Sequence, residues 1–179
     1  MVSASYRSAR ALQVPIVKVW VPRTEIQNAM TSCDDKFPNE SGGLLFGYRA
    51  STNDFVVEHI SNPGPKAEHG SRRYVPDYGF DEAYALNLHK RSGGKTTYLG
   101  DWHSHPSEFS SSLSWKDRKA SKRIILSEEA GISTALSMLL FGTKGRWNTR
   151  VWACELETSF VFLHSLVTIR AEIKLYNLA

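Results

Sequence analysis

The sequence predicts one α/β domain in which helices cover a sheet, giving three layers. Helical and strand patterns alternate along the chain instead of falling into separate halves, which is typical of this arrangement. With 179 residues, 41% of them hydrophobic, the chain can bury a full-sized core in one domain. We therefore expect a single domain over 14–179, preceded by a flexible arm over 1–13 that is rich in Ser, Ala and Arg.

The first 60 residues predict three strands and one helix. The strands are expected over 15–21, 44–48 and 54–60, with a hairpin near 51–53. The helix is expected over 24–36, because apolar residues recur there at the three- and four-residue spacing of a helical face. Thr24 and Gln27 have the spacing of a capping box at its start.

The rest of the chain predicts a loop, two helices and further strands. The loop spans 61–76 and is rich in Pro and Gly. A helix then begins at Asp77 or Asp81 and ends at Gly93-Gly94, with its inward side chains at Phe80, Ala83, Tyr84 and Leu88. The remaining elements are a strand over 96–103, a helix over 115–130, paired strands over 135–141 and 146–155, and strands over 159–167 and 169–176, the last with a helical alternative.

Composition indicates a soluble protein of a reducing compartment, and we expect the cytoplasm. The net charge of +4 fits an acidic partner surface but is far below that of a dedicated nucleic-acid binder. Cys33 and Cys154 are isolated and lack metal-site spacing, so they are expected as buried thiols. The longest apolar segment, around 132–141, is too short and too polar to span a bilayer.

The chemistry is concentrated between Asp101 and Asp117. Because alternate side chains of a strand share a face, His103 and His105 project together and provide two corners of a metal site. Asp117 lies in the first turn of the next helix, where it can supply a third ligand. Each feature alone has a plainer interpretation: most histidines bind no metal, Ser114 with Asp117 is a capping box, and Glu40 beside two glycines is a turn residue. Their conjunction favours a catalytic site.

Together these residues resemble the JAMM, or MPN-plus (JAB domain), zinc metalloproteases. The signature of that family is an upstream Glu, then H-[ST]-H-P, a short loop and S-x-x-D. The segment from Glu40 to Gly47 matches the upstream part, and the segment from His103 to Asp117 matches the rest. The stretch over 62–77 is similar to prokaryotic JAB-type members, which pair with bacterial E1- and E2-like enzymes, some in antiphage operons.

The resemblance covers roughly 14–157 and contains one departure. Eight residues separate His105 from Ser114, where the common family pattern has seven. The extra residue falls in the Ser110-Ser111-Ser112 loop, which we expect to absorb it.

The resemblance implies a cytidine-deaminase-like α-β-α sandwich with a mixed sheet, and a role for each motif residue. His103, His105 and Asp117 would ligate one Zn²⁺ and leave the fourth position open for water, as in catalytic zinc sites. Glu40 would act as general base and then general acid, and Ser114 would hydrogen-bond the oxyanion. Asp101 is the second choice as a ligand and is expected instead to support a ligand from outside the metal's coordination or to contact substrate.

Two basic regions keep alternative interpretations. Arg72, Arg73 and Tyr74 could grip an extended substrate tail, or they could form an ordinary basic loop. The basic residues of the helix over 115–130 could bind an acidic partner, a nucleotide or nucleic acid, although a solvated helix face is preferred. These basic residues are Lys116, Arg118, Lys119, Lys122 and Arg123.

The function implied is a zinc-dependent isopeptidase, similar to a deubiquitinase. It would cleave the amide bond joining a ubiquitin-like modifier, or an enzyme conjugated through its C-terminus, to its target. Two alternatives remain open: an inactive scaffold that only binds, and a hydrolase of short peptides or sulfur-carrier adducts. Every ligand position is filled, which favours the enzyme. No H-E-x-x-H helix, deaminase motif or phosphate loop is present.

Overall fold

The computed structural model describes residues 16–107, 109–159 and 163–178. The predicted arm over 1–13 lies outside the described residues. The strands and helices follow one another in this order: β1 Lys18–Pro22, α1 Arg23–Lys36, β2 Gly42–Arg49, β3 Asp54–Ile60, β4 Glu68–Gly70, β5 Arg73–Val75, α2 Tyr78–Arg91, β6 Thr97–His105, α3 Trp115–Leu126, β7 Thr134–Thr143, β8 Arg146–Ser159, β9 Leu163–Arg170 and β10 Glu172–Tyr176.

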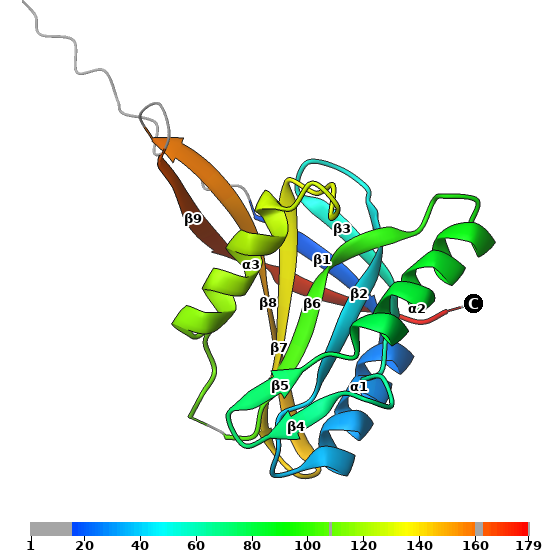
Figure 1. Ribbon diagram of the computed structural model, residues 1–179, viewed down its shortest axis with the longest axis vertical. Helices are drawn as coiled ribbons and strands as arrows, with labels where there is room; N and C mark the ends of the chain where they lie inside the picture. Colours follow the sequence, from blue (N-terminus) through cyan, green and yellow to red (C-terminus); the bar gives the residue numbers. More distant parts are fainter. Residues whose placement is uncertain (1–15, 108, 160–162, 179) are drawn as a thin grey trace, which may run out of the picture.

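The centre of the molecule is a mixed sheet of eight strands in the order β10-β1-β3-β2-β6-β7-β8-β9 (Figure 1). β6 lies in the middle, antiparallel to β2 and parallel to β7. β4 and β5 form a separate two-stranded hairpin. The predicted α/β fold with a mixed sheet is confirmed.

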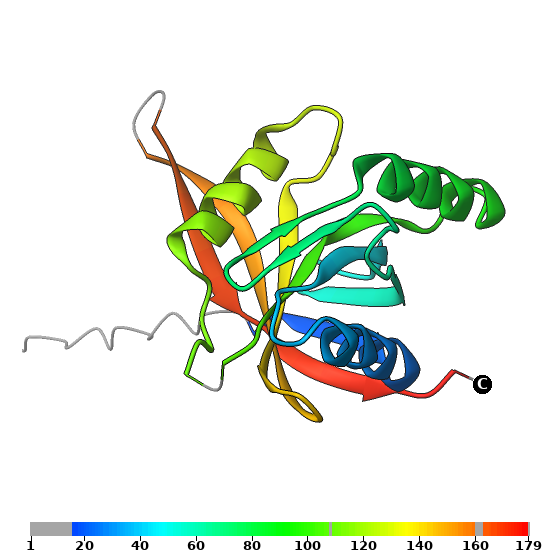
Figure 2. The ribbon, with the colours of Figure 1, turned by 60° about the horizontal axis from the view of Figure 1, so that its bottom comes forward.

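Helices cover both faces of this sheet, which produces the three predicted layers (Figure 2). α1 packs on one face and buries Ile26, Ala29 and Cys33 in the larger core cluster. α2 and α3 lie on the other face, where Ile124 and Ile125 of α3 pack against a second cluster. Alternate residues of β7 enter the two clusters, because neighbouring side chains of a strand point to opposite faces.

The C-terminal strands join the two edges of the sheet. β9 pairs antiparallel with β8 at one edge, and β10 pairs parallel with β1 at the other. Only Ala171 separates them: its N–H donates to the carbonyl of Val151 (2.9 Å), and the N–H of Glu172 donates to the carbonyl of Val17 (2.8 Å). The sheet therefore curls, so that one continuous chain segment pairs with β8 through β9 and with β1 through β10. The edges of β8 and β1 would otherwise stay open.

Several predictions about local structure are wrong. The capping box at Thr24 and Gln27 is absent, because α1 already begins at Arg23 and its N-cap, Pro22, offers no side-chain acceptor. The predicted loop over 61–76 contains the β4–β5 hairpin. Three-residue strands are too short to show a periodic pattern, so composition alone indicated a loop.

The helix predictions need smaller corrections. α2 starts after Asp77, whose side chain accepts from the N–H of Phe80, as one of the two alternatives predicted. Ala83 is exposed rather than inward, and Asp81 is buried in its place. α3 ends at Leu126, four residues early, because Ser127 is extended. The helical alternative for 169–176 is also wrong, since β10 forms there.

The cysteines behave as the composition predicts. Cys33 and Cys154 are free and buried. Among the described residues, no helix has the length and apolar character needed to cross a bilayer. The predicted strand over 159–167 falls partly on 160–162, which lie outside the described residues, and β9 extends to Arg170.

Candidate metal centre

Three side chains from two elements converge at the end of β6. The Nε2 atoms of His103 and His105 lie 3.2 Å apart. Asp117 Oδ2 lies 3.4 Å from the Nε2 of His103 and 3.7 Å from that of His105. One potential ligand atom from each residue falls within a set that spans at most 4.8 Å. Two imidazoles and a carboxylate at this spacing can hold one metal ion.

The alternation of β6 explains why the two imidazoles meet. His103 and His105 point to the face that α3 covers, whereas Trp102 and Ser104 point to the opposite face and are buried. Trp102 Nε1 donates to the carbonyl of Ser61 (2.8 Å), which holds the strand from behind. The predicted orientation of these four side chains is confirmed.

The loop between β6 and α3 fixes the ring of His105. Its Nδ1 lies 3.1 Å from the carbonyl oxygen of Ser110 and 2.9 Å from the Ser110 hydroxyl. A carbonyl oxygen only accepts, so the first contact favours a proton on Nδ1 and leaves a lone pair on Nε2 for a metal. Burial, followed by the charge of His103, lowers the pKa of His105.

The loop is itself anchored from β8. Arg150 Nη1 donates to the carbonyl oxygen of Ser111 (2.5 Å) and to its hydroxyl (2.8 Å). The guanidinium also lies 4.9 Å from the centre of the Phe141 ring. Arg150 thus holds the residue next to Ser110, and through it the position of His105.

The start of α3 positions Asp117. The N–H of Ser114 donates to Asp117 Oδ2 (2.6 Å), and the N–H of Asp117 donates to the Ser114 hydroxyl (3.3 Å), which is a capping box. Burial opposes ionisation of Asp117, but the hydrogen bond and charge of His103 and the bonds with Ser114 outweigh it. They hold the pKa of this carboxyl well below its usual range. The capping interpretation of Ser114 is confirmed, and its hydroxyl hydrogen stays available to donate.

Backbone contacts on three sides position Glu40. Its N–H donates to the carbonyl of Gly70 in β4 (2.8 Å), and its carbonyl oxygen lies 2.9 Å from Nδ1 of His69. The next residue, Ser41, is clamped to Ser104 of β6: its N–H donates to the Ser104 hydroxyl (2.8 Å), and its carbonyl accepts from the Ser104 N–H (2.7 Å). Glu40 is therefore held beside β6 by the hairpin and by β2.

The environment of Glu40 suits a proton-transfer group. Burial raises the pKa of its carboxyl, while the positive charge of His103 opposes that shift. A carboxylate whose pKa is raised towards neutrality accepts a proton more readily, which is the property a general base needs. Gly42 pairs with His103 in the register of β2 and β6, and Ser41 bonds to Ser104, so Glu40 lies beside the end of β6 that carries the candidate metal ligands.

The two glycines after Ser41 allow this close packing. A Cβ on Gly42 would lie 2.6 Å from the ring of Tyr74, and one on Gly43 would lie 2.5 Å from the carbonyl oxygen of Ser61. Any side chain would push β2 away from the hairpin or from the residue that follows β3. Close packing after Glu40 thus requires both glycines.

Comparison with known proteins agrees with this layout. A family model described as prokaryotic homologs of the JAB domain matches residues 22–155, most of the chain. The chain belongs to this JAB family. The probable metalloprotease y4qB of Sinorhizobium fredii (strain NBRC 101917 / NGR234) is 27% identical over 159 residues, 89% of this chain and 97% of that protein.

Two further relatives of this JAB domain are named CD-NTase/cGAS isopeptidase. The protein from Escherichia coli (strain TW11681) is 35% identical over 109 residues, and that from Vibrio cholerae serotype O1 (strain ATCC 39315 / El Tor Inaba N16961) is 34% identical over 111 residues. Each match covers 60% of this chain and 65% of the relative. These names support a hydrolase role.

A solved structure shares the fold of the JAB domain. The solution structure of protein DSY2949 from Desulfitobacterium hafniense has a TM-score of 0.60, covers 89% of this chain and 93% of its own, and is 16% identical. At this identity the similarity concerns the fold alone. It agrees with the mixed sheet and its flanking helices described above.

The remaining predicted site residues of the JAB domain lie outside the candidate ligand set. Asp101 accepts from the hydroxyl of Tyr98 (2.5 Å), and burial raises the pKa of its carboxyl. The ring of Tyr74 packs against Gly42, and its hydroxyl is buried without a hydrogen-bond partner. Arg72 and Arg73 are exposed on the hairpin rather than in a flexible loop. Contact of these residues with substrate stays a prediction.

Sequence reasoning missed the residues that support the site. His69, Ser110 and Arg150 contact Glu40, His105 and the connecting loop through long-range or irregular structure. The extra serine of the loop was noticed, but nothing in its composition indicated that a serine would hold His105. Arg150 lies 39 residues from Ser111, and no local pattern links the two.

Proposed function

We propose that this JAB domain is a zinc-dependent isopeptidase or peptidase. The observation that carries the proposal is the convergence of His103, His105 and Asp117, at the end of β6 to which the segment after Glu40 is bonded. Two imidazoles and one carboxylate are a donor set that suits Zn²⁺, whereas Mg²⁺ and Ca²⁺ prefer oxygen ligands. Three protein ligands leave a coordination position open, as catalytic zinc sites require. Zinc, when bound, would supply a Lewis acid that activates water.

Within this proposal each side chain has one task. Glu40 takes a proton from the attacking water and passes it to the leaving amine, which its raised pKa favours. Ser114 accepts from the N–H of Asp117 through its oxygen, so its O–H is free to donate to the oxygen that becomes negative. Asp117 belongs to both the candidate metal site and the cap of α3. Its Oδ2 faces the imidazoles and also accepts a hydrogen bond from the N–H of Ser114.

The substrate we propose is a protein joined to another through its C-terminus by an amide bond. Two relatives are named CD-NTase/cGAS isopeptidase, which supports a conjugated-protein substrate. This chain spans 65% of the length of each of those relatives. We also propose one catalytic domain over 14–179 and a cytoplasmic location, as expected from the composition. From the resemblance to prokaryotic JAB-type members we propose that the protein works alongside bacterial E1- and E2-like enzymes in antiviral defence.

The first test is Glu40→Gln, with Glu40→Ala beside it. Gln keeps the shape of the side chain but cannot accept the proton, so we expect hydrolysis to fall by about 100-fold or more while the zinc content stays at the wild-type level. The substrate is a folded ubiquitin-like domain fused through its C-terminal tail to a reporter. Wild-type rates in either variant would remove Glu40 from the role of base.

The same assay separates the proposal from its two alternatives. A hydrolase of short peptides or sulfur-carrier adducts would cleave the isolated tail peptide faster than the folded fusion. A binding scaffold would bind the fusion but cleave neither substrate, and wild type and Glu40→Gln would then behave alike. Zinc analysis of His103→Ala/His105→Ala is the control, because this variant should lose the metal in every case.

A further inference from the structure

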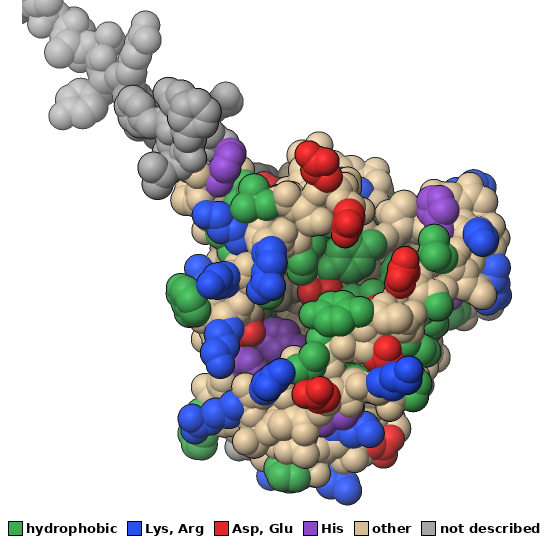
Figure 3. All heavy atoms as spheres, viewed as in Figure 1, with side chains coloured by type: hydrophobic (Ala, Val, Ile, Leu, Met, Phe, Trp, Pro, Cys, Tyr) green, Lys and Arg blue, Asp and Glu red, His purple; other side chains and the backbone are tan. Residues whose placement is uncertain are grey.

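A groove runs between α3 and β9, next to the metal centre but outside it. Its lining residues are Trp115, Arg118, Lys119, Lys122 and Leu166. Figure 3 shows Lys and Arg side chains gathered over α3, beside the hollow in which histidine side chains are visible. The lining contains three cations and no carboxylate, so it is basic with an apolar part.

The aromatic residue of this groove is unusually open to solvent. Trp115 is 72% exposed although it is the first residue of α3 and directly follows Ser114. The ammonium group of Lys119 lies 5.1 Å from the centre of its ring. Large exposed aromatics are enriched at protein–protein contacts, where their rings are buried by a partner.

The opposite faces of α3 carry different groups. Asp117 points to the imidazoles of β6, whereas Arg118, Lys119 and Lys122 line the groove. Lys122 Nζ donates to the carbonyl of His164 in β9 (2.5 Å), which ties the helix to the strand. The floor of the groove is therefore fixed to the same helix that positions the candidate metal ligand.

We propose that this groove docks an acidic segment of the protein substrate. Carboxylates of that segment would pair with Arg118, Lys119 and Lys122, and one of its apolar side chains would pack on Trp115 and Leu166. This inference rests on the proposed function and extends it, because it names the chemistry by which the substrate is selected. Charge pairs of this kind raise association rates and select partners.

A polypeptide fits the groove better than a nucleic acid does. The chain as a whole has a net charge of only +4, and three cations line the groove. Leu166 and the indole also offer an apolar contact that a carboxylate-rich peptide with one leucine would use and a phosphate backbone would not.

The docking test uses a short fluorescein-labelled peptide of Glu, Asp and Leu. Its binding to zinc-loaded Glu40→Gln protein is measured by fluorescence anisotropy, so that no hydrolysis occurs. We expect binding that weakens with added salt and falls by about tenfold in Lys119→Glu/Lys122→Glu. The matched control is Lys90→Glu/Arg91→Glu, which reverses two exposed charges on α2 and should bind like the parent.

Three outcomes would overturn the inference. They are equal loss of binding in both double variants, equally tight binding of a peptide with lysines in place of the acids, and tighter binding of a single-stranded oligonucleotide of the same length. Trp115→Ala provides a second readout that leaves the charges intact, and we expect weaker binding there too. Melting curves of each variant confirm that the fold is retained.

Failure of the docking surface is distinguishable from failure of the proposed function. Hydrolysis of an isolated tail peptide should be unchanged in Lys119→Glu/Lys122→Glu, whereas a fusion carrying the acidic segment should show a raised KM with kcat retained. If no substrate is cleaved but the acidic peptide binds as expected, the groove stands without the enzyme. If the fusion is cleaved but neither its KM nor peptide binding changes in Lys119→Glu/Lys122→Glu, the groove is not the docking site.

Discussion

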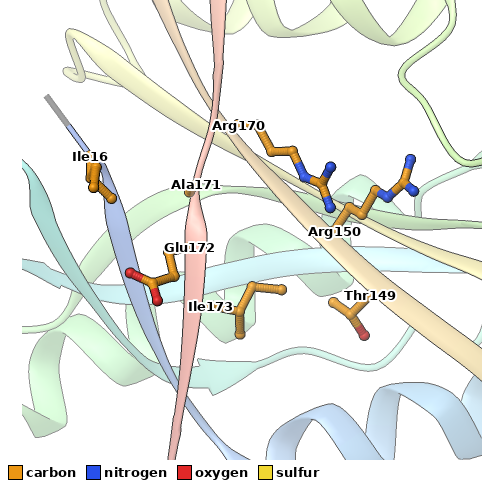
Figure 4. Close-up of a pocket in the computed structure, with 7 residues that line it drawn as sticks. All are labelled: Ile16, Thr149, Arg150, Arg170, Ala171, Glu172 and Ile173. Carbon is orange, nitrogen blue, oxygen red and sulfur yellow. The ribbon is translucent and has the colours of Figure 1, made fainter. Parts of the chain in front are cut away.

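At the scale of single residues, the centre depends on contacts that lie outside its sequence motifs. His105 is oriented by Ser110, and the neighbouring Ser111 is held by Arg150 of β8. Figure 4 shows Arg150 and Arg170 extending side by side at one pocket. Only Arg150 of the pair bonds to the loop in the described structure. The two arginines therefore differ in whether they bond to the loop that orients His105.

We predict that Arg150→Met weakens metal binding although it touches no ligand. Loss of the bonds to Ser111 frees the loop, so the ring of His105 is less well oriented, and residues that orient ligands typically affect metal affinity by about 10- to 100-fold. A competition titration with a zinc indicator measures the change. Arg170→Met is the control and should keep wild-type affinity; equal effects of both variants would indicate a general change of the strands instead.

At the scale of elements, local patterns predicted the ligand-bearing parts and missed the supporting hairpin. β6 and the start of α3 were predicted because strand alternation and a capping box are short-range signals. The β4–β5 hairpin holds the backbone of Glu40 through Gly70 and His69, yet each of its strands has only three residues. Tyr74 of this hairpin packs on Gly42, a contact between segments distant in sequence that no local pattern reveals.

The start of α3 allows stability and catalysis to be separated. We predict that Ser114→Ala lowers the free energy of unfolding by about 1 kcal/mol, because the cap of α3 is lost. Ser114→Gly should lower it by only about a few tenths of a kcal/mol. Both variants lack the hydroxyl, so hydrolysis should fall by about 100-fold or more in each. Denaturant unfolding and steady-state kinetics measure the two effects. Ser114→Thr should retain both the stability and the rate of hydrolysis. If the rate fell only in the variant that also loses stability, Ser114 would have no role at the oxyanion.

At the scale of the whole molecule, the sequence predicted the layers but not the closure of the sheet. Alternating helical and strand patterns were enough to predict a three-layer α/β arrangement. The passage from β9 to β10 occurs at Ala171 without a glycine or proline, so nothing local marks the point where the chain leaves one sheet edge for the other. That point is set by bonds to Val151 and Val17, residues far away in the chain.

The three candidate ligands join the sheet to the helical layer that covers it, so metal binding should stabilise the whole fold. Zinc at about 100 times its dissociation constant adds about 2.7 kcal/mol if only the folded chain binds it. For a chain of this size that raises Tm by roughly 5 to 10 °C. Calorimetry of metal-stripped protein with added zinc measures the shift. Magnesium should give none, because imidazoles suit it poorly.

His103→Ala/His105→Ala should also show no shift with zinc, since two of the three ligands are gone. The zinc shift should shrink as the pH falls, because a protonated imidazole cannot bind metal. The lowered pKa of His105 keeps that ring neutral to a lower pH than an ordinary histidine. A zinc shift of equal size in the double variant would place the metal elsewhere in the chain.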